Sequence, residues 1–473
     1  MGPTEANGII DMPSYQYPLI NDNLPQYLIN HPAREVQSLS SKSSENRYYI
    51  ASIEFNKNKI DFFVSDRIDC ENALKLDSIR ILNSLNERIS IFKFNYDYFT
   101  SPKIGRGWTS SSLSNLKRLK LESLIIKNDD KYIFTYNSVQ LPPKTSFALD
   151  YWGYYNGQIN NKTPFPNPID FVNSSITYNN IDSMTPELLN KFCGVMFSDD
   201  FYCKANILEK IQYPTGGYSK LFYSLNEFNN LSITNNPKYG NLNFVKGNGL
   251  RIDSIIHYDN ENNRCNQLFY HYIGGKLLNN LSFFYIKNEG YARISNKTLF
   301  QCSSDFFNIL SNNASTSSPL NDITGVGYDS VYVIQPGEGK TLHTFTNNKE
   351  ILPQYENKQL SWGFVNILPS YHKGLPNGLL TSELIYDKSD SLKKKTINTY
   401  KLIASNYIFY NSKVNYDGFF DLRPREAYHK VEVNYFPIYK TEALLETKEE
   451  ISIFNGKELI NTERYVYIKN NYH

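Results

Sequence analysis

A short strand, a polar turn and a second strand that ends in alternating aromatic residues recur along this chain. The clearest copy spans Leu208–Tyr223, where two apolar-rich runs flank a Pro-Thr-Gly-Gly turn. The glycines allow the positive φ angles of a tight reversal, and Pro214 ends the first run. Alternate residues, such as Ile211 and Tyr213, then share one face of the strand. This stretch is predicted to be a β-hairpin.

The same pattern returns at three other clear places. Its copies lead from Leu76–Ile79 to Ile91–Tyr96, from Leu121–Leu124 to Tyr132–Tyr136, and from Ile252–Ile255 to Leu268–Tyr272. Further hairpins are expected at 378–403 and at about 440–468. A degenerate repeat of this kind predicts an all-β fold. We expect an array of antiparallel β-hairpins that forms a long twisted or coiled sheet, with at most one or two short helices.

Composition agrees with a sheet and argues against several partners. Aromatic residues make up 15% of the chain, with 38 Tyr and 29 Phe against 3 Trp, and such residues suit half-buried pleated surfaces. Only 40% of the residues are hydrophobic, so no membrane span is expected. A net charge of +2 with both signs interspersed provides no strong field for nucleic acid.

The chain divides by composition into three parts. Residues 1–47 are rich in Pro, Asn and Ser and are expected to form an extended lead-in. Residues 48–285 form the β-hairpin repeat region, with an irregular loop insert at 141–200. Residues 286–473 form a looser β region that ends in further hairpins. One short helix is expected at Thr185–Phe192, where a capping threonine precedes a proline.

One aromatic cluster in the insert is a candidate ligand site. Trp152, Tyr154 and Tyr155 could present ring faces on which a sugar would stack. The alternative is an aromatic corner that packs the loop onto the sheet, and we favour that interpretation while keeping the stacking role open.

No catalytic residue, metal site or cofactor site is predicted. Gly337–Thr341 lacks the leading glycine of a phosphate loop and is predicted to be a hairpin turn. Gly217–Leu221 lacks the final glycine of a nucleophile elbow. The seven histidines show no metal-ligand spacing. The carboxylate pairs Asp129–Asp130 and Asp199–Asp200 are expected to be solvated turn residues rather than a glycosidase pair.

The five cysteines contain no Cys-x-x-Cys pair. Cys193 and Cys203 could form a disulfide if the chain is exported, and the favoured alternative is that they remain buried free thiols.

Several short motifs, in this order, carry a resemblance to a known family. They are Leu141-Pro142 with Asp150–Gly157, then Tyr213–Tyr218 and Gly249–Ile252, supported by Gly327-Tyr328, Gly339–Thr341 and Asn377–Leu380. From about Tyr48 onwards the chain resembles the secreted RHS/YD-repeat-like proteins of Bacteroidetes, relatives of toxin-complex and RHS shells. The aspartate-proline-glycine signature of the RHS core is not found, so the resemblance does not imply self-cleavage.

The resemblance implies architecture rather than chemistry. It suggests an internal fragment of an exported protein, secreted or at the cell surface. A signal peptide and a β-domain would lie upstream, and YD repeats with a variable C-terminal effector downstream. The expected function is a non-catalytic structural segment that scaffolds, encloses or presents that effector, so its partners are the remainder of its own polypeptide. The alternative is a surface adhesin or glycan-binding β-module, and a secreted glycoside hydrolase is a third reading.

Overall fold

The computed structural model describes fifteen stretches of the chain. They are residues 48–105, 107, 112–126, 130–161, 194–229, 233–236, 240–242, 245–278, 282–288, 292–295, 298–300, 306–312, 325–348, 375–411 and 434–467. The expected lead-in 1–47 and the helix expected at 185–192 lie outside these stretches.

Sixteen strands form one antiparallel sheet in which each strand pairs with the one that precedes it in the sheet and the one that follows. The sheet strands are β1 (Ser52–Phe55), β2 (Asn58–Asp66), β3 (Leu74–Leu82), β4 (Arg88–Thr100), β5 (Lys117–Ile126), β6 (Asp130–Tyr136), β7 (Leu208–Gln212), β8 (Tyr218–Phe228), β11 (Val245–Tyr258), β12 (Arg264–Ile273), β19 (Ser330–Gln335), β20 (Gly339–Phe345), β21 (Leu380–Asp387), β22 (Leu392–Asn411), β23 (Asn434–Phe454) and β24 (Lys457–Arg464). The prediction of an all-β array of antiparallel hairpins is confirmed.

The other elements lie in the connections. The small two-stranded ladders are β9 (Ile233–Asn236) with β10 (Gly240–Leu242), β13 (Lys276–Leu277) with β18 (Val326–Gly327), β14 (Ser282–Asn288) with β17 (Phe306–Asn312), and β15 (Ala292–Ser295) with β16 (Thr298–Phe300). In the described residues, helical structure is limited to the short helix α2 (Leu113–Leu116) and the 3-10 turn η4 (Tyr202–Lys204).

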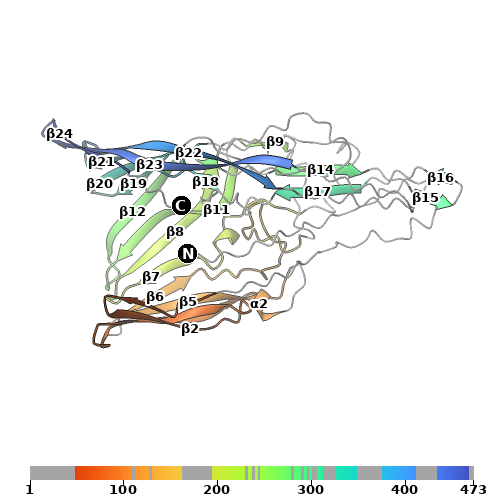
Figure 1. Ribbon diagram of the computed structural model, residues 1–473, viewed down its shortest axis with the longest axis horizontal. Helices are drawn as coiled ribbons and strands as arrows, with labels where there is room; N and C mark the ends of the chain where they lie inside the picture. The colour runs from red at the N-terminus through yellow and green to blue at the C-terminus, as the bar shows by residue number, and fades with distance from the viewer. Residues whose placement is uncertain are drawn as a thin grey trace.

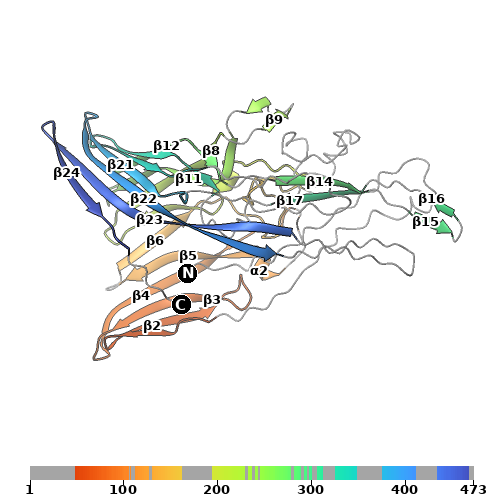
Figure 2. The same ribbon diagram turned by 45° about the horizontal axis from the view of Figure 1, so that its top comes forward.

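The large sheet is strongly curved. In Figure 1 it runs from β2 at the bottom through β8 and β12 to β24 at the top left, so its two ends lie on opposite sides. Figure 2 shows the same separation after the rotation. The hairpin tips of β2 and β24 lie at one side of the molecule, and the additional ladders β14–β17 and β15–β16 extend from the other.

A β-bulge marks the start of six hairpins. In each case the first strand of the new hairpin carries one residue more than the strand that it joins, which locally increases the twist. The extra residues are Asp77, Glu122, Glu209, Asp253, Thr381 and Glu446. Three of the six bulges carry an apolar–acidic–serine triplet, in Leu76–Ser78, Leu121–Ser123 and Ile252–Ser254, so this repeated sequence coincides with a repeated irregularity of the ladder.

A tyrosine hydroxyl binds the backbone beside five of these bulges. Each phenol donates to the carbonyl oxygen of the residue that precedes the extra one, on the other strand of its own hairpin. The pairs are Tyr136 to Leu121 and Tyr223 to Leu208 at 2.7 Å, Tyr272 to Ile252 at 2.8 Å, and Tyr400 to Leu380 and Tyr467 to Leu445 at 2.9 Å. The phenol thus adds a side-chain hydrogen bond at the point where the bulge interrupts the ladder.

The sheet itself contains few fully buried side chains. Every residue of β3, β19, β20 and β21 is half-buried, on both faces of its strand. Most of the fully buried apolar side chains among the described residues lie instead in the connection between β6 and β7 and where it meets the sheet: Phe147, Ala148, Tyr151, Trp152, Tyr155, Met196, Ala205, Leu225 and Phe228. A second group, Leu277, Leu278 and Val326, lies at the β13–β18 ladder. Cohesion of the sheet therefore depends on its ladder and on cross-strand contacts.

Removing a tyrosine hydroxyl that binds a carbonyl beside a bulge tests how much these cross-strand contacts stabilise the sheet. We expect Tyr136→Phe and Tyr223→Phe each to lower the free energy of unfolding by about 1 to 3 kcal/mol, since each leaves a half-buried carbonyl without its donor. The matched control is Tyr132→Phe, because the Tyr132 hydroxyl makes no hydrogen bond within the described part of the chain. Chemical denaturation of the three variants measures the difference. Equal loss in all three would show that the hydroxyl–carbonyl bond contributes nothing specific.

Candidate functional site

Residues 141–161 and 194–207 of the β6–β7 connection form a compact unit within the described part of the chain and are called the insert below. Asp150 lies at its centre with 1% of its surface exposed. Its Oδ1 accepts hydrogen bonds from the backbone N–H groups of Trp152 and Tyr154, both at 2.9 Å. The Ser198 hydroxyl donates to its Oδ2, which ties the two halves of the insert together.

Burial gives Asp150 an unusual proton affinity. Desolvation raises the pKa of its carboxyl to about 6, although the hydrogen bonds from Ser198 and from the backbone act in the opposite direction. A pKa near 6 is typical of a general acid, but this carboxyl is enclosed and all its described partners are structural. We therefore assign Asp150 to the folding of the insert.

The aromatic cluster predicted from the sequence is split by the fold. Trp152 is 4% exposed and packs edge-on against Phe228 of β8, with ring centroids 5.7 Å apart. Tyr155 is 9% exposed and packs against Tyr202 of η4 at 5.1 Å. Tyr154 alone of the three is reached by solvent, with 43% of its surface exposed. A stacking role for this cluster stays a prediction, and its exposed ring surface belongs to Tyr154.

Two glycines of β11 let the insert approach the sheet. A Cβ at Gly247 would lie 2.5 Å from the Trp152 ring, and a Cβ at Gly249 would lie 2.7 Å from the Tyr154 ring. Both positions have positive φ, +154° and +83°, so side chains are disfavoured by conformation as well as by space. The Gly249–Ile252 motif noted in the sequence thus serves the docking of the insert.

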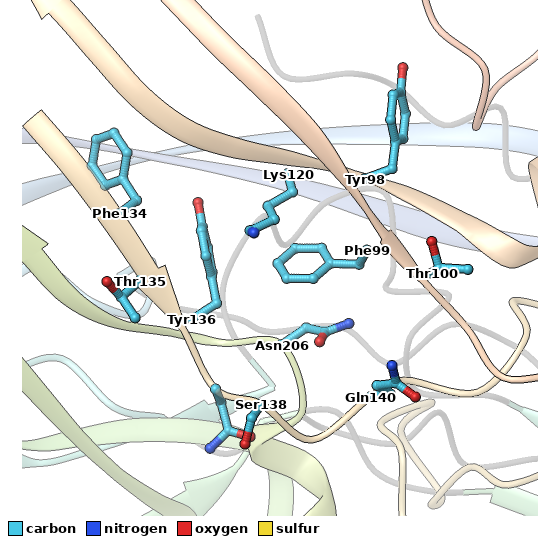
Figure 3. A pocket seen from close by; sticks show the side chains of 11 residues that line it. Tyr98, Phe99, Thr100, Lys120, Phe134, Thr135, Tyr136, Ser138, Gln140 and Asn206 are labelled. Carbon is cyan, nitrogen blue, oxygen red and sulfur yellow. The ribbon is translucent and has the colours of Figure 1, made fainter.

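A recess of about 460 Å³ opens where β4, β5 and β6 meet the connection that follows β6 (Figure 3). Phe99, Lys120 and Tyr136 point toward one another from three adjacent strands. The Phe99 and Tyr136 rings meet edge-on at 5.1 Å, and the Lys120 ammonium lies 5.7 Å from the Phe99 ring. The complete lining is Tyr98, Phe99, Thr100, Lys120, Phe134, Thr135, Tyr136, Asn137, Ser138, Gln140 and Asn206.

The recess combines aromatic rings with polar side chains that can donate and accept hydrogen bonds. Aromatic rings stand beside amide and hydroxyl groups, including those of Gln140 and Asn206, and this mixture suits an uncharged ligand rich in hydroxyls. Its lining contains neither a carboxylate nor a histidine that could act as general acid or base.

A serine–histidine pair lies elsewhere on the sheet. The Ser219 hydroxyl lies 2.6 Å from Nδ1 of His257 and 2.7 Å from the Tyr213 hydroxyl. Such a pair could activate a nucleophile, but Ser219 is 3% exposed and both partners already bind its hydroxyl. It links β8 to β11 and to the Pro-Thr-Gly-Gly turn. Sequence analysis did not anticipate this contact, because His257 lies in a different hairpin.

The remaining sequence predictions concern thiols, metals and turns. Cys203 is a free, half-buried thiol, and burial raises its pKa to about 12, while Cys193 lies outside the described residues. No group of three or more His, Cys, Asp or Glu side chains that could hold a metal ion occurs in the described stretches. Gly337 has φ +84° in the turn between β19 and β20, as expected for a hairpin.

Asp199 has partners in its own turn, while Asp200 binds both that turn and β8, where the Leu225 N–H donates to its Oδ1 at 3.1 Å. Asp199 Oδ1 accepts from the N–H groups of Phe201 and Tyr202, and Asp200 pairs with Lys204 at 2.6 Å. Asp129 lies outside the described residues. The structure contains no helix, in the stretches that it describes, with the length and apolar character needed to cross a membrane.

Comparison with known proteins provides no relative: no family model matches the chain, and no curated protein matches it. Function must therefore be argued from the geometry described above.

Alanine substitutions at two glycines distinguish the cost of a steric contact from the cost of a positive φ angle. Gly249 and Gly337 have nearly the same φ, +83° and +84°, but no atom lies within 4 Å of a Cβ built on Gly337. We expect Gly249→Ala to lower the free energy of unfolding by about 1 to 3 kcal/mol more than Gly337→Ala, because only the former displaces the Tyr154 ring. Thermal or chemical unfolding measures both. Equal losses would show that the insert does not need this close approach.

Asp150 predicts a specific pH dependence of stability. Its folded-state pKa of about 6 exceeds the ordinary 3.8, so its stabilisation is complete below pH 3.8 and is lost as the pH rises through 6. The loss amounts to on the order of 2 to 3 kcal/mol. Asp150→Asn keeps the oxygen that accepts the two backbone N–H groups and cannot ionise. We therefore expect the variant to gain stability relative to the wild type between pH 4 and about 7, as measured by denaturant unfolding. A constant difference across this range would contradict the assignment.

Proposed function

We propose that this chain is a non-catalytic structural segment of an exported RHS/YD-repeat-like protein. The observation that carries the proposal is the six-fold use of one junction: a new hairpin begins with a β-bulge against the preceding hairpin. Such a rule extends a sheet by any number of hairpins, and each added bulge increases its twist. A long curved sheet built in this way is suited to surround or display another polypeptide.

The polar clusters support a structural role. Asp150 organises the insert and Ser219 links adjacent strands, so neither presents a reactive group to solvent. The half-buried faces of the sheet carry many aromatic side chains, and these would provide adaptable contact area for an enclosed chain. In this proposal the partners are the remainder of the same polypeptide and a variable C-terminal effector. The location is the cell surface or the medium, and neither nucleic acid nor a membrane span is involved.

The test combines gene context with location. Reading the open frame on both sides of this segment should show a signal peptide upstream and YD repeats with a variable terminal domain downstream. An antibody against the segment should detect the native protein in the secreted or surface fraction. A frame without such neighbours, together with detection only in the cytosol, would contradict the proposal.

The second candidate is a glycan-binding β-module, and the recess beside Phe99 and Tyr136 favours it. Rings beside amides and hydroxyls are the groups with which proteins hold sugars. A glycan array probed with the isolated chain distinguishes the two functions. Binding that Phe99→Ala abolishes would support the glycan-binding module. The control is Phe222→Ala, which removes an exposed ring on β8 and should leave the binding unchanged.

A further inference from the structure

The two outer strands of the large sheet are open on one side. Among the described strands, β1 pairs only with β2 and β24 only with β23. Every residue of both strands is exposed, including apolar side chains such as Ile53 on β1 and Leu459 and Ile460 on β24. Figures 1 and 2 place these two ends of the sheet far apart, so one copy cannot pair its own two edges. An open, apolar strand edge is a template for another strand.

β1 has the sequence of a strand that begins a hairpin. Ile50-Ala51-Ser52-Ile53 matches Leu76-Asp77-Ser78-Ile79 and Ile252-Asp253-Ser254-Ile255, which form two of the bulged junctions. At every such junction, the first residue of the motif pairs with a defined position near the end of the preceding hairpin. That position holds Tyr96, Tyr136, Tyr223, Phe345 and Tyr400 at five junctions and Val64 at the sixth.

Tyr467, just after β24, occupies the position at the end of its hairpin that Tyr136, Tyr223 and Tyr400 occupy in theirs. Its hydroxyl donates to the Leu445 carbonyl, as the other junction tyrosines do within their hairpins. We propose that copies of this chain associate head to tail, with β24 of one copy paired antiparallel to β1 of the next. The junction rule sets the register: Tyr467 lies opposite Ile50, Ala51 is the bulge, and Arg464 lies opposite Glu54.

The directions of the backbone groups agree with this register independently. The N–H of Phe62 donates to the carbonyl of Ala51, so the backbone groups of Ala51 face β2 and those of Glu54 face the open edge. The N–H of Tyr465 donates to Glu446, so Tyr465 faces β23 and Arg464 faces outward. In the proposed register, the outward-facing backbone groups of Glu54 and Arg464 lie opposite one another and can form hydrogen bonds. A shift by one residue would set outward-facing groups of one strand against inward-facing groups of the other.

The side chains are complementary as well. Glu54 and Arg464 lie opposite each other with opposite charges, and Ile53 lies opposite Tyr465, which gives an apolar cross-strand pair. Because the contact joins two different edges, it is heterologous and leaves a free edge at each end of the assembly. The inference uses only the register of the sheet and does not rest on the proposed function, in which hairpins of the same polypeptide would occupy these two edges instead.

Cross-linking tests the register directly. One preparation carries Ile53→Cys and another Tyr465→Cys, both together with Cys265→Ser because Cys265 is an exposed free thiol, and the two are mixed under mild oxidation. Their backbone groups point away from the new contact, so the pair would be of the closely spaced kind, with Cα atoms about 4.5 Å apart, within disulfide range. We expect a covalent dimer in the mixture that neither preparation forms alone. The matched control replaces Tyr465→Cys by Glu463→Cys, which lies on the same face but two residues out of register.

Charge reversal tests the association in solution. Glu54→Arg and Arg464→Glu should each weaken self-association about threefold to tenfold, as measured by sedimentation velocity over a range of concentrations. The double variant restores opposite charges and should recover the wild-type value, while thermal unfolding stays unchanged for all three. A chain that remains monomeric at every concentration and cross-links no better than the control would overturn the proposal and assign the edges to hairpins of another sequence.

Discussion

The bond between a tyrosine hydroxyl and a backbone carbonyl beside a β-bulge is the interaction on which the rest of this sheet depends. A bulge adds a residue to one strand and disrupts the ladder locally, and the phenol of the same hairpin donates a hydrogen bond to the carbonyl beside it. Basic and acidic side chains reinforce some of the junctions. Lys75 binds Asp77 at 2.6 Å, and its ammonium also lies 5.8 Å from the Tyr96 ring. At the Asp77 junction, which among the described residues lacks the tyrosine–carbonyl bond found at the other five, a lysine thus contacts both a carboxylate and an aromatic ring.

Junctions of this kind involve only neighbouring strands, so the sheet tolerates large insertions between them. The pairing of β12 with β19, which has no bulge, shows the same tolerance: Ile273 pairs with Ser330, although the chain between them contains several small ladders. Likewise, the insert separates β6 from β7 without changing the junction at Glu209. Stability that is the sum of local contacts also explains why the described strands need no continuous core.

The insert follows the opposite principle. It closes around a buried carboxyl, and its aromatic rings meet edge-on in a small core that the sheet lacks. Its attachment to β11 depends on backbone that approaches ring faces at Gly247 and Gly249. A compact, strictly packed unit is thus fixed to an extended sheet, and the two would respond differently to substitution, to pH and to the loss of neighbouring hairpins.

The sequence by itself determined the class of fold and the positions of the hairpins, because alternation and turn residues act within a few positions of the chain. The turns at Gly216 and Gly337 and the recurrent apolar–acidic–serine motif could all be read in this way. The tertiary structure alone decided that the motif forms a bulge, that Trp152 is buried and that His257 binds Ser219. Each of these facts is a relation between separate strands or loops. Periodicity assigns a residue to a face of its strand, but the register of the neighbouring strand decides what that residue touches.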